Sequence, residues 1–403
     1  MIHRRAPAPA PAPEISPAAV MAFRVRRHHL LARAPHAQLP AITGQVGGVQ
    51  AQVLSAAGLS LWARIEGVGP DDVDKALGPS SRLVRAWCMR RTLHLLPARD
   101  LATFARGTAK RAERDVLWLK NRGVSASQLD LLMEAVLSTL EVPSTRDELA
   151  VGVARSTGGR VIEQRGGGWG NTARLSCVKF QGFTYPAHWL LHLVGAFGAV
   201  CYGEERGGQP TYVRGDRWVR GWRDVKVEEA EESLLRRYLS AYGPASAEDF
   251  SSWTGMRLRD AREVWQRVGD EIAPVSLEGR VAGVLRQDVR ELGRGLTGDD
   301  LPSVRLLPYF DVFLLGHQSK RHLLAAEHHG KVYRPQGWVA PVVLLDGKVA
   351  GVWEHAMHRD RLTVTVHPLR GHPTVPRSQL QQEVSRLGRY LGATGSALRM
   401  RSG

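Results

Sequence analysis

The sequence predicts an α+β protein in which tandem winged-helix units are followed by a C-terminal β-rich domain of half-barrel type. Three features predict this fold: a turn and a capped helix that occur twice, a hairpin pattern that closes each copy, and a change to strand periodicity after residue 300. A chain of 403 residues is also longer than one hydrophobic core usually supports. We therefore expect roughly two to four structural units.

The repeated element consists of a proline-marked turn and the start of a helix. The two prolines, Pro143 and Pro244, stand 101 positions apart. Two residues after each proline comes a hydroxyl residue, Thr145 or Ser246, and an acid follows three residues later. This is the capping-box pattern of a helix N-terminus. Apolar residues at helical spacing precede both copies, so each copy begins as helix, turn and helix.

The residues that follow each capped helix complete a winged helix. A third helix and two strands are expected in both copies: Ala187–Phe197, Ala199–Gly203 and Thr211–Arg214 in the first, and Leu258–Val268, Ile272–Leu277 and Val281–Arg286 in the second. In a winged helix the third helix usually enters the major groove of DNA. Generic helical pairs would explain the repeated caps alone, but they would not explain a hairpin in both copies.

These patterns divide the chain into five segments. They are a disordered Pro-Ala-rich tail (1–20), a first winged-helix unit with a Gln-x-Gln motif (21–125), a second unit (126–225), a third unit (226–300) and the C-terminal β-rich domain (301–403). An insertion in the second unit, Gly158–Phe183, has a glycine-rich centre and is expected to be a flexible loop. The last segment is expected to hold a hairpin, a further strand and a closing helix: Val339–Leu345 with Lys348–Trp353, Leu362–His367 and Pro376–Leu391.

The composition favours a polyanionic partner. The net charge is +16 and the pI is about 10.4, which favours nucleic acid, although an organism with arginine-rich proteins would show the same excess. Three scattered cysteines fit neither a disulfide framework nor a paired metal site. No apolar run reaches the ~18 residues of a membrane span, and the N-terminus lacks the apolar stretch of a secretory signal. We expect a cytoplasmic monomer without membrane contact.

A glycine-flanked pair of glutamines is the first candidate site. Gln50 and Gln52 follow Gly47 and Gly48, and side chains two positions apart point the same way in an extended chain. A polar pair at such a turn is suited to holding one water molecule. Glutamines that simply face the solvent are the alternative.

The segment Trp87–His94 is the second candidate. In an extended conformation Arg90, Thr92 and His94 share one face, which brings a cation, a hydroxyl and an imidazole together. Such a face suits phosphate contact or the support of an active site. An ordinary edge strand is the alternative.

Asp311 and a nearby group of basic residues form the third candidate. Asp311 lies inside an apolar run, so it is either a buried acid tied to backbone amides, which we favour, or part of a site. Four histidines near Lys320 and Arg321 match no zinc-binding spacing, so phosphate contact is expected and no metal is. No dinucleotide or nucleophile motif is found, and no cofactor is expected. The histidines are His317, His322, His328 and His329.

Five blocks in this order resemble one known family. The blocks are Gln50-Ala51-Gln52, Met89–His94, Arg206–Pro210, Pro308–Asp311 and Asp346–Trp353. With them the chain resembles the AlkZ-type, or YcaQ-like, bacterial DNA glycosylases, a family built of winged helices. The blocks span most of the chain and leave out the N-terminal tail.

The resemblance implies an activity and roles for particular residues. It implies hydrolysis of the N-glycosidic bond of bulky N7-alkylated purines in double-stranded DNA, as monoadducts or interstrand crosslinks. Gln50 and Gln52 would be catalytic, and a glutamine at the second position, where a sister subfamily has aspartate, indicates the type linked to self-resistance in antibiotic producers. Asp311 would support the site if it lines it. The residues expected to contact DNA are Arg90, Thr92, His94, Arg206, Gln209, Lys320 and Arg321.

Neutral glutamines suit this chemistry. An N7-alkylguanine is cationic and leaves as a neutral base without a general acid. The enzyme then has to place water and stabilise an oxocarbenium-like sugar. An amide accepts a hydrogen bond through its oxygen and donates one through its nitrogen. The alternative function is a winged-helix transcription regulator, but the sequence shows no ligand-binding or dimerisation module for it.

Overall fold

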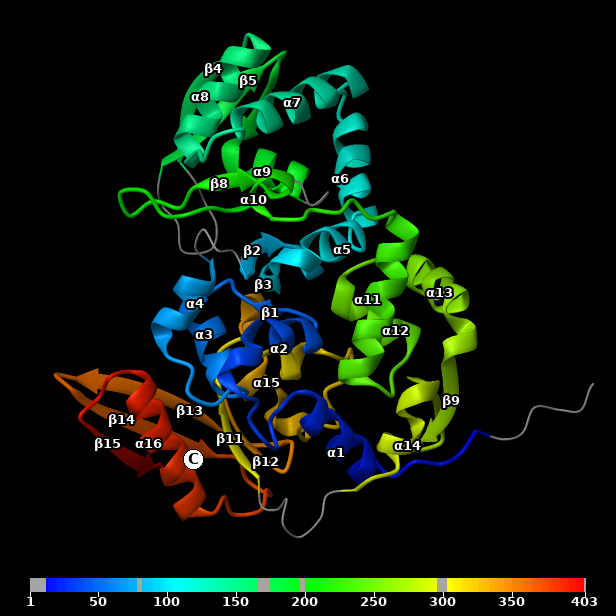
Figure 1. Ribbon diagram of the computed structural model, residues 1–403, viewed down its shortest axis with the longest axis vertical. Helices are drawn as coiled ribbons and strands as arrows, with labels where there is room; N and C mark the ends of the chain where they lie inside the picture. The colour runs from blue at the N-terminus through cyan, green and yellow to red at the C-terminus, as the bar shows by residue number, and fades with distance from the viewer. Residues whose placement is uncertain (1–11, 78–81, 166–173, 196–199, 296–302, 402–403) are drawn as a thin grey trace, which may run out of the picture.

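The computed structural model describes residues 12–77, 82–165, 174–195, 200–295 and 303–401, with the backbone alone for 111–115 (Figure 1). Helix α1 (Pro17–Arg27) comes first, and the first winged-helix unit follows it. That unit consists of α2 (Leu39–Gln45), β1 (Val49–Gln50), α3 (Leu54–Trp62), α4 (Pro70–Leu77), β2 (Leu83–Trp87) and β3 (Leu93–Pro97). Its antiparallel sheet has the order β1-β3-β2, so the short strand that carries Gln50 pairs with the central strand.

Two helices lead from the first unit to the second, which forms the top of Figure 1. They are α5 (Leu101–Arg106) and α6 (Lys110–Lys120). The second unit holds α7 (Ala126–Thr139), α8 (Arg146–Thr157), β4 (Arg160–Arg165), β5 (Arg174–Phe180), β6 (Phe183–Pro186), α9 (Ala187–Gly195), β7 (Val200–Tyr202) and β8 (Tyr212–Arg214). A short helix, α10 (Gly215–Trp218), leads on to the third unit.

The third unit repeats the winged-helix order. It contains α11 (Val227–Tyr242), α12 (Ala247–Thr254), α13 (Leu258–Arg267), β9 (Ile272–Leu277) and β10 (Arg280–Leu285), followed by the short α14 (Val289–Leu292). In both repeats the residue after the proline forms a β-bridge to the last strand, Ser144 to Tyr212 and Ala245 to Gly283. The bridge occupies the place of β1 in the first unit, so the three units share one topology.

Both predicted capping boxes are confirmed. The Thr145 and Ser246 hydroxyls accept hydrogen bonds from the backbone of Glu148 and Asp249, and each acidic side chain reaches back to the cap residue. These contacts lie within four residues of chain, which is why the local pattern was sufficient to predict them.

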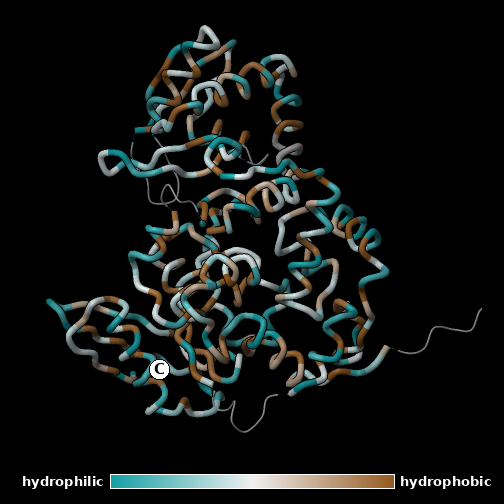
Figure 2. Tube along the Cα trace, in the orientation of Figure 1, coloured by the Kyte–Doolittle hydropathy of each residue, from teal (hydrophilic) through white to brown (hydrophobic). Residues whose placement is uncertain are grey.

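The C-terminal domain is a five-stranded mixed sheet with strand order β11-β12-β13-β14-β15. Neighbouring strands are antiparallel except β14 and β15, which are parallel and are joined through α16, as a parallel pair requires. Figure 2 shows hydrophilic residues at the protruding turn between β13 and β14. The elements are β11 (Val304–Leu307), α15 (His329–Val332), β12 (Val342–Leu345), β13 (Lys348–His358), β14 (Arg361–Pro368), α16 (Arg377–Tyr390) and β15 (Gly395–Met400).

Two expectations about irregular segments are corrected. The predicted disordered tail is too long, because Ser16 caps α1 at Pro17 and the Ile15 N–H donates to the Ser276 carbonyl at 2.9 Å. Residues 1–11 lie outside the described residues. The insertion Gly158–Phe183 is not a loop, since β4, β5 and the start of β6 form a three-stranded sheet over it. Its glycine-rich centre, 166–173, also lies outside the described residues.

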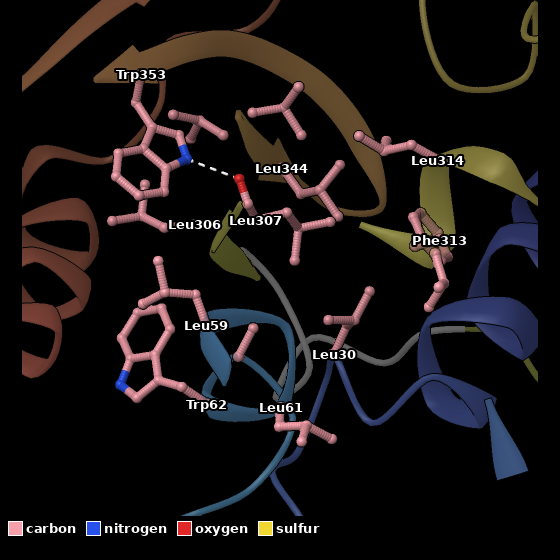
Figure 3. Packing of buried hydrophobic residues seen from close by; sticks show 14 of the residues in the cluster. Leu30, Leu59, Leu61, Trp62, Leu306, Leu307, Phe313, Leu314, Leu344 and Trp353 are labelled. Carbon is pink, nitrogen blue, oxygen red and sulfur yellow. Dashed lines mark hydrogen bonds between the residues drawn. The ribbon is translucent and has the colours of Figure 1, made fainter. Parts of the chain in front are cut away.

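The largest hydrophobic core joins the first unit to the C-terminal domain. Figure 3 shows Leu59 and Trp62 of α3 packed against residues of β11 and β12, with the Trp353 indole donating to the Leu307 carbonyl at 2.9 Å. A second core lies mainly between the first and third units, and a third lies within the second unit and against β2 and β3. The predicted domain limits remain a prediction, because the cores cross them. No helix among the described residues is long and apolar enough to cross a bilayer.

Candidate active site

A tight glycine turn sets the position of the glutamine motif. Gly47 and Gly48 both have left-handed backbones, with φ of 78° and 83°. A Cβ at Gly47 would lie 2.8 Å from the Trp253 ring, and one at Gly48 would lie 2.7 Å from the Leu96 side chain. Only glycine fits both the torsion and the space. The turn therefore fixes the direction in which β1 enters the sheet.

Gln50 is nearly buried and its amide is oriented by an arginine. Arg90 donates from Nη2 to the Gln50 Oε1 at 3.1 Å and from Nη1 to the Trp253 carbonyl at 2.5 Å. A guanidinium has donors and no acceptor, so the amide oxygen must face it. The Gln50 amide nitrogen is thereby turned away from Arg90. Trp253 belongs to α12, so this contact connects the motif to the third unit.

Gln52 is exposed, and its backbone is held more firmly than its side chain. The Ala51 N–H donates to the Leu93 carbonyl at 2.7 Å, and the Ala51 carbonyl accepts from the Arg85 Nε at 3.1 Å. The Gln52 Oε1 accepts only a long bond, 3.4 Å, from the Leu93 N–H. The motif thus combines one buried, oriented amide with one exposed amide that is free to turn.

The segment that precedes β3 is not extended as predicted. Met89–Arg91 form a 3-10 turn in which Arg90 and Arg91 have φ of 54° and 61°. Arg90 therefore does not share a strand face with Thr92 and His94. Thr92 is partly buried and its hydroxyl donates to the Met89 carbonyl at 3.1 Å. The positive φ values cost conformational energy that the surrounding contacts must offset.

His94 lies opposite Gln50 in the β1–β3 pair and is 1% exposed. Burial, with a smaller contribution from the Arg90 charge, lowers the pKa of His94 to about 3. The ring is therefore neutral at physiological pH. Nδ1 lies 3.0 Å from the Thr92 carbonyl, which places the proton on Nδ1 and leaves Nε2 as the acceptor.

Asp311 has a structural position. Its carboxylate forms a bidentate pair with Arg64, at 2.7 and 2.8 Å, and both side chains are fully buried. It also accepts from the Ser60 hydroxyl and the Phe313 N–H. Ser60 lies on α3 and Arg64 shortly after it, so the pair fastens the helix that follows Gln52 to the C-terminal domain. The structural alternative for Asp311 is the one this geometry supports.

The other four residues expected to contact DNA lie in two places, two of them on the wing of the second unit and two in the loop between β11 and α15. Arg206 and Gln209 stand at the exposed tip between β7 and β8, where Arg206 is ion-paired with Glu148. Lys320 donates to the His317 carbonyl, and burial, followed by the Arg90 charge, lowers the pKa of Lys320 to about 8. Arg321 is exposed. The charge of Lys320 therefore interacts with that of Arg90, the residue that orients Gln50.

Sequence reasoning missed three residues that hold the motif: Arg64, Arg85 and Trp253. The first two had a signal, since Arg64 is a lone arginine just after an apolar helix and Arg85 is one inside an apolar strand, and a buried charge has to be paired. Trp253 gave none, because only its carbonyl is used and it stands about 200 positions away. Among the described residues no three histidine, cysteine or acidic side chains gather in a way that could hold a metal ion.

Three winged helices on a basic chain are typical of a protein that acts on DNA. The family to which this chain belongs makes it a DNA glycosylase, a hydrolase of N-glycosyl bonds. The chain belongs to the family described as "DNA glycosylase AlkZ-like", whose model matches residues 43–390.

Two comparisons agree with that membership. The chain is 31% identical over 392 residues to a protein of Streptomyces sahachiroi named "Interstrand DNA cross-link repair glycosylase", covering 94% of this chain and 98% of that one. It is also similar to the solved structure titled "Streptomyces sahachiroi DNA glycosylase AlkZ", with a TM-score of 0.78 and 28% identity over 96% of this chain and 100% of that chain. The expected family, fold class and glycosylase activity are confirmed.

Proposed function

We propose that the protein releases bulky N7-alkylated purines from double-stranded DNA, acts as a monomer, and accepts interstrand crosslinks as well as monoadducts. The name of the Streptomyces sahachiroi relative supports crosslinks as substrates. Gln50 and Gln52 are the proposed catalytic residues, and the bond they hydrolyse joins C1′ of the sugar to the purine.

The observation that carries this proposal is the charge state of the groups around Gln50. Its oxygen is bound to a guanidinium and the ring opposite it is a neutral histidine with a pKa of about 3. Neither group is an acid that can protonate a leaving base at neutral pH. With neither group as an acid, a leaving base that arrives with its own positive charge, as an N7-alkylpurine does, is favoured over a normal base, which carries none.

The two amides have different tasks in this proposal. Because Arg90 occupies the Gln50 oxygen, Gln50 acts through its amide nitrogen as a donor. Gln52 is exposed and weakly held, so its oxygen can accept from the attacking water. Loss of water positioning costs on the order of a hundredfold in rate.

Contacts to the DNA backbone are proposed for the exposed wing tip and the loop after β11. Arg206 and Gln209 supply them on the wing and Lys320 and Arg321 on that loop, and a further contact is proposed for Thr92, directly before β3. Arg90 and His94 were expected in this group, but the burial of His94 and the bond from Arg90 to Gln50 favour a supporting role beside Gln50.

The test compares one duplex that carries either an N7-alkylguanine or a neutral lesion such as uracil. We expect release of the alkylated base and almost none of the neutral lesion, since the missing acid is worth roughly 10²–10⁴-fold. Gln50→Ala and Gln52→Ala should each lower single-turnover release about a hundredfold with little change in DNA affinity. Gln45→Ala, a nearby glutamine that contacts His29, is the matched control. Equal release of both lesions would refute the mechanism.

Self-resistance to a DNA-alkylating natural product is the proposed biological role. Expression in a sensitive bacterium should raise its tolerance of such a compound, and Gln50→Ala should abolish the gain. Tolerance that survives in the Gln50→Ala strain would contradict this role.

A further inference from the structure

We infer that Arg85 is a positioning residue that ties the peptide between the two glutamines to the second winged-helix unit through Tyr202. The inference rests on the proposed catalytic role of Gln50 and Gln52. It adds a residue that touches neither glutamine side chain, and a connection between the way the second unit is seated and the geometry of the motif.

The first step is the hydrogen bond at Ala51. Arg85 projects from β2 and its Nε donates to the Ala51 carbonyl at 3.1 Å. The Ala51 N–H is already bonded to Leu93 in β3. Both polar groups of Ala51 are therefore occupied. The carbonyl belongs to the peptide plane shared with Gln52, so Arg85 sets the direction in which the Gln52 backbone leaves the strand.

The second step is the aromatic ring beneath Arg85. The guanidinium carbon lies 4.6 Å from the centroid of the Tyr202 ring, within the range of a cation–π contact. Tyr202 ends β7 and is itself held by Trp87 at 5.4 Å and by Tyr212 at 4.9 Å between ring centroids. Among the described residues no carboxylate forms an ion pair with Arg85. The ring and the Ala51 carbonyl are thus what fix this side chain.

The third step is the place of Tyr202 in the second unit. The tip that carries Arg206 and Gln209 begins directly after it, and the Gly203 N–H closes that tip on the Thr211 carbonyl at 3.0 Å. A displacement of β7 moves the ring, the ring moves Arg85, and Arg85 moves the Ala51–Gln52 peptide. Since a misplacement of about 1 Å costs on the order of a hundredfold in rate, this short path is sufficient to make base release depend on how the second unit is seated.

The experiment measures single-turnover base release and DNA affinity for two pairs of variants. We expect Arg85→Met to lower release ten- to a hundredfold and Arg85→Lys to recover part of it. Tyr202→Leu should lower release about tenfold, whereas Tyr202→Phe, which keeps the ring, should stay within threefold. The double variant Arg85→Met/Tyr202→Leu should be no slower than Arg85→Met. DNA affinity should change less than threefold in all of them.

Arg237→Met is the matched control, because Arg237 also combines a polar partner, Asp100, with an aromatic ring, Phe104 at 5.6 Å, without touching the motif. A normal rate in Arg85→Met, while the glutamine variants are impaired, would overturn the inference and leave the proposed function intact. Normal rates in the glutamine variants would refute the proposed function instead.

Two further outcomes also count against the inference. A loss of DNA affinity with a normal rate at saturating DNA would assign Arg85 to phosphate contact. Equal rates for Tyr202→Leu and Tyr202→Phe would remove the link to the second unit. If Arg85→Met fails to fold, the Tyr202 pair decides the question without it.

Discussion

The second and third winged-helix units start from the same local pattern and differ in what covers their wings. In the third unit the β9–β10 hairpin packs against Val20 and Phe23 of α1, and the chain before α1 bonds to Ser276. In the second unit the tip between β7 and β8 is exposed from Glu204 to Gln209. One hairpin has become part of a core, and the other remains available to a ligand.

The third helices of these two units, α13 and α9, also differ in their charged residues. The arginines of α13 are neutralised within the protein: Arg259 by Asp260, Arg262 by Glu248 and Arg267 by Glu231 and Glu232. Helix α9 carries no acid, and its two histidines lie near Arg146. The comparison teaches that a repeated fold is not a repeated DNA-binding surface. We therefore expect the second unit to meet DNA through its exposed wing tip, and not through α9, whose residues are all buried or half-buried.

The largest expected effect is a difference between the two wings in how much each contributes to the free energy of unfolding. Phe23 is fully buried against the third unit's hairpin, so Phe23→Ala should destabilise the protein by about 3–5 kcal/mol. Gln209→Ala on the exposed wing should change stability by less than about 0.5 kcal/mol. Denaturant unfolding of both variants measures this. Similar losses would mean that the two hairpins are equally integrated.

The second prediction concerns the loss of protein stability at low pH. His28 and His317 are buried against Tyr242 at the junction with the third unit, and burial holds the pKa of both well below the usual value. Below pH 6.5 the unfolded chain binds protons that the folded protein does not. Each histidine then removes up to about 1.4 kcal/mol of stability per pH unit as the pH falls, and none above pH 6.5.

In the second unit, His192 lies 4.7 Å from the Trp87 ring, and burial is the main cause that lowers its pKa to about 4. Its contribution therefore ends near pH 4. His28→Phe should flatten the decline of the melting temperature between pH 6.5 and 4. An unchanged pH profile in that variant would contradict the assignment.

The third prediction tests the helix caps, the feature in which the second and third units are alike. Thr145→Ala and Ser246→Ala each remove a hydroxyl that accepts from a helix N-terminus, so each should cost about 1 kcal/mol. Equal losses would show that the difference between the units arises beyond their caps. A much larger loss in one of them would place the difference in the cap itself.

The smallest effect is expected from the wing. Arg206 is ion-paired with Glu148 in the free protein, which withholds it from phosphate. Glu148→Gln keeps the capping box, because glutamine fulfils the same role, and should raise DNA affinity a few-fold. Arg206→Ala should weaken DNA binding, and it should reduce by about 1 the magnitude of the slope of log affinity against log salt concentration, the salt slope. If neither variant changes the salt slope, Arg206 does not contact the DNA phosphates.

The parts of the fold that the sequence predicted are those coded by neighbouring residues. The capping boxes, the β9–β10 hairpin and the strand at Leu362–His367 each depend on a few consecutive positions. Strand β4 escaped prediction because its residues are almost all exposed and polar, and it shows no apolar alternation. Without a buried face there is no period to detect.

The sequence suggested where the proposed site lies, but it did not predict the contacts that hold the glutamines in place. The glycines and glutamines are adjacent in the chain, and their resemblance to a family is legible in the sequence. The orientation of Gln50, in contrast, depends on Trp253, and the 3-10 turn at Met89–Arg91 replaced the expected strand face. Contacts between distant segments leave no local pattern, so only the assembled structure reveals them.

The core shared by the first unit and the C-terminal domain has a consequence for synthesis on the ribosome. Its residues lie at 21–95 and again at 304–390, with the second and third units between them. The glutamine turn therefore leaves the exit tunnel long before the residues that complete its packing. The second unit, whose core is mostly local, can fold while the ribosome is still translating. We therefore expect the nascent chain to acquire a winged helix first and the full packing around the glutamine turn last.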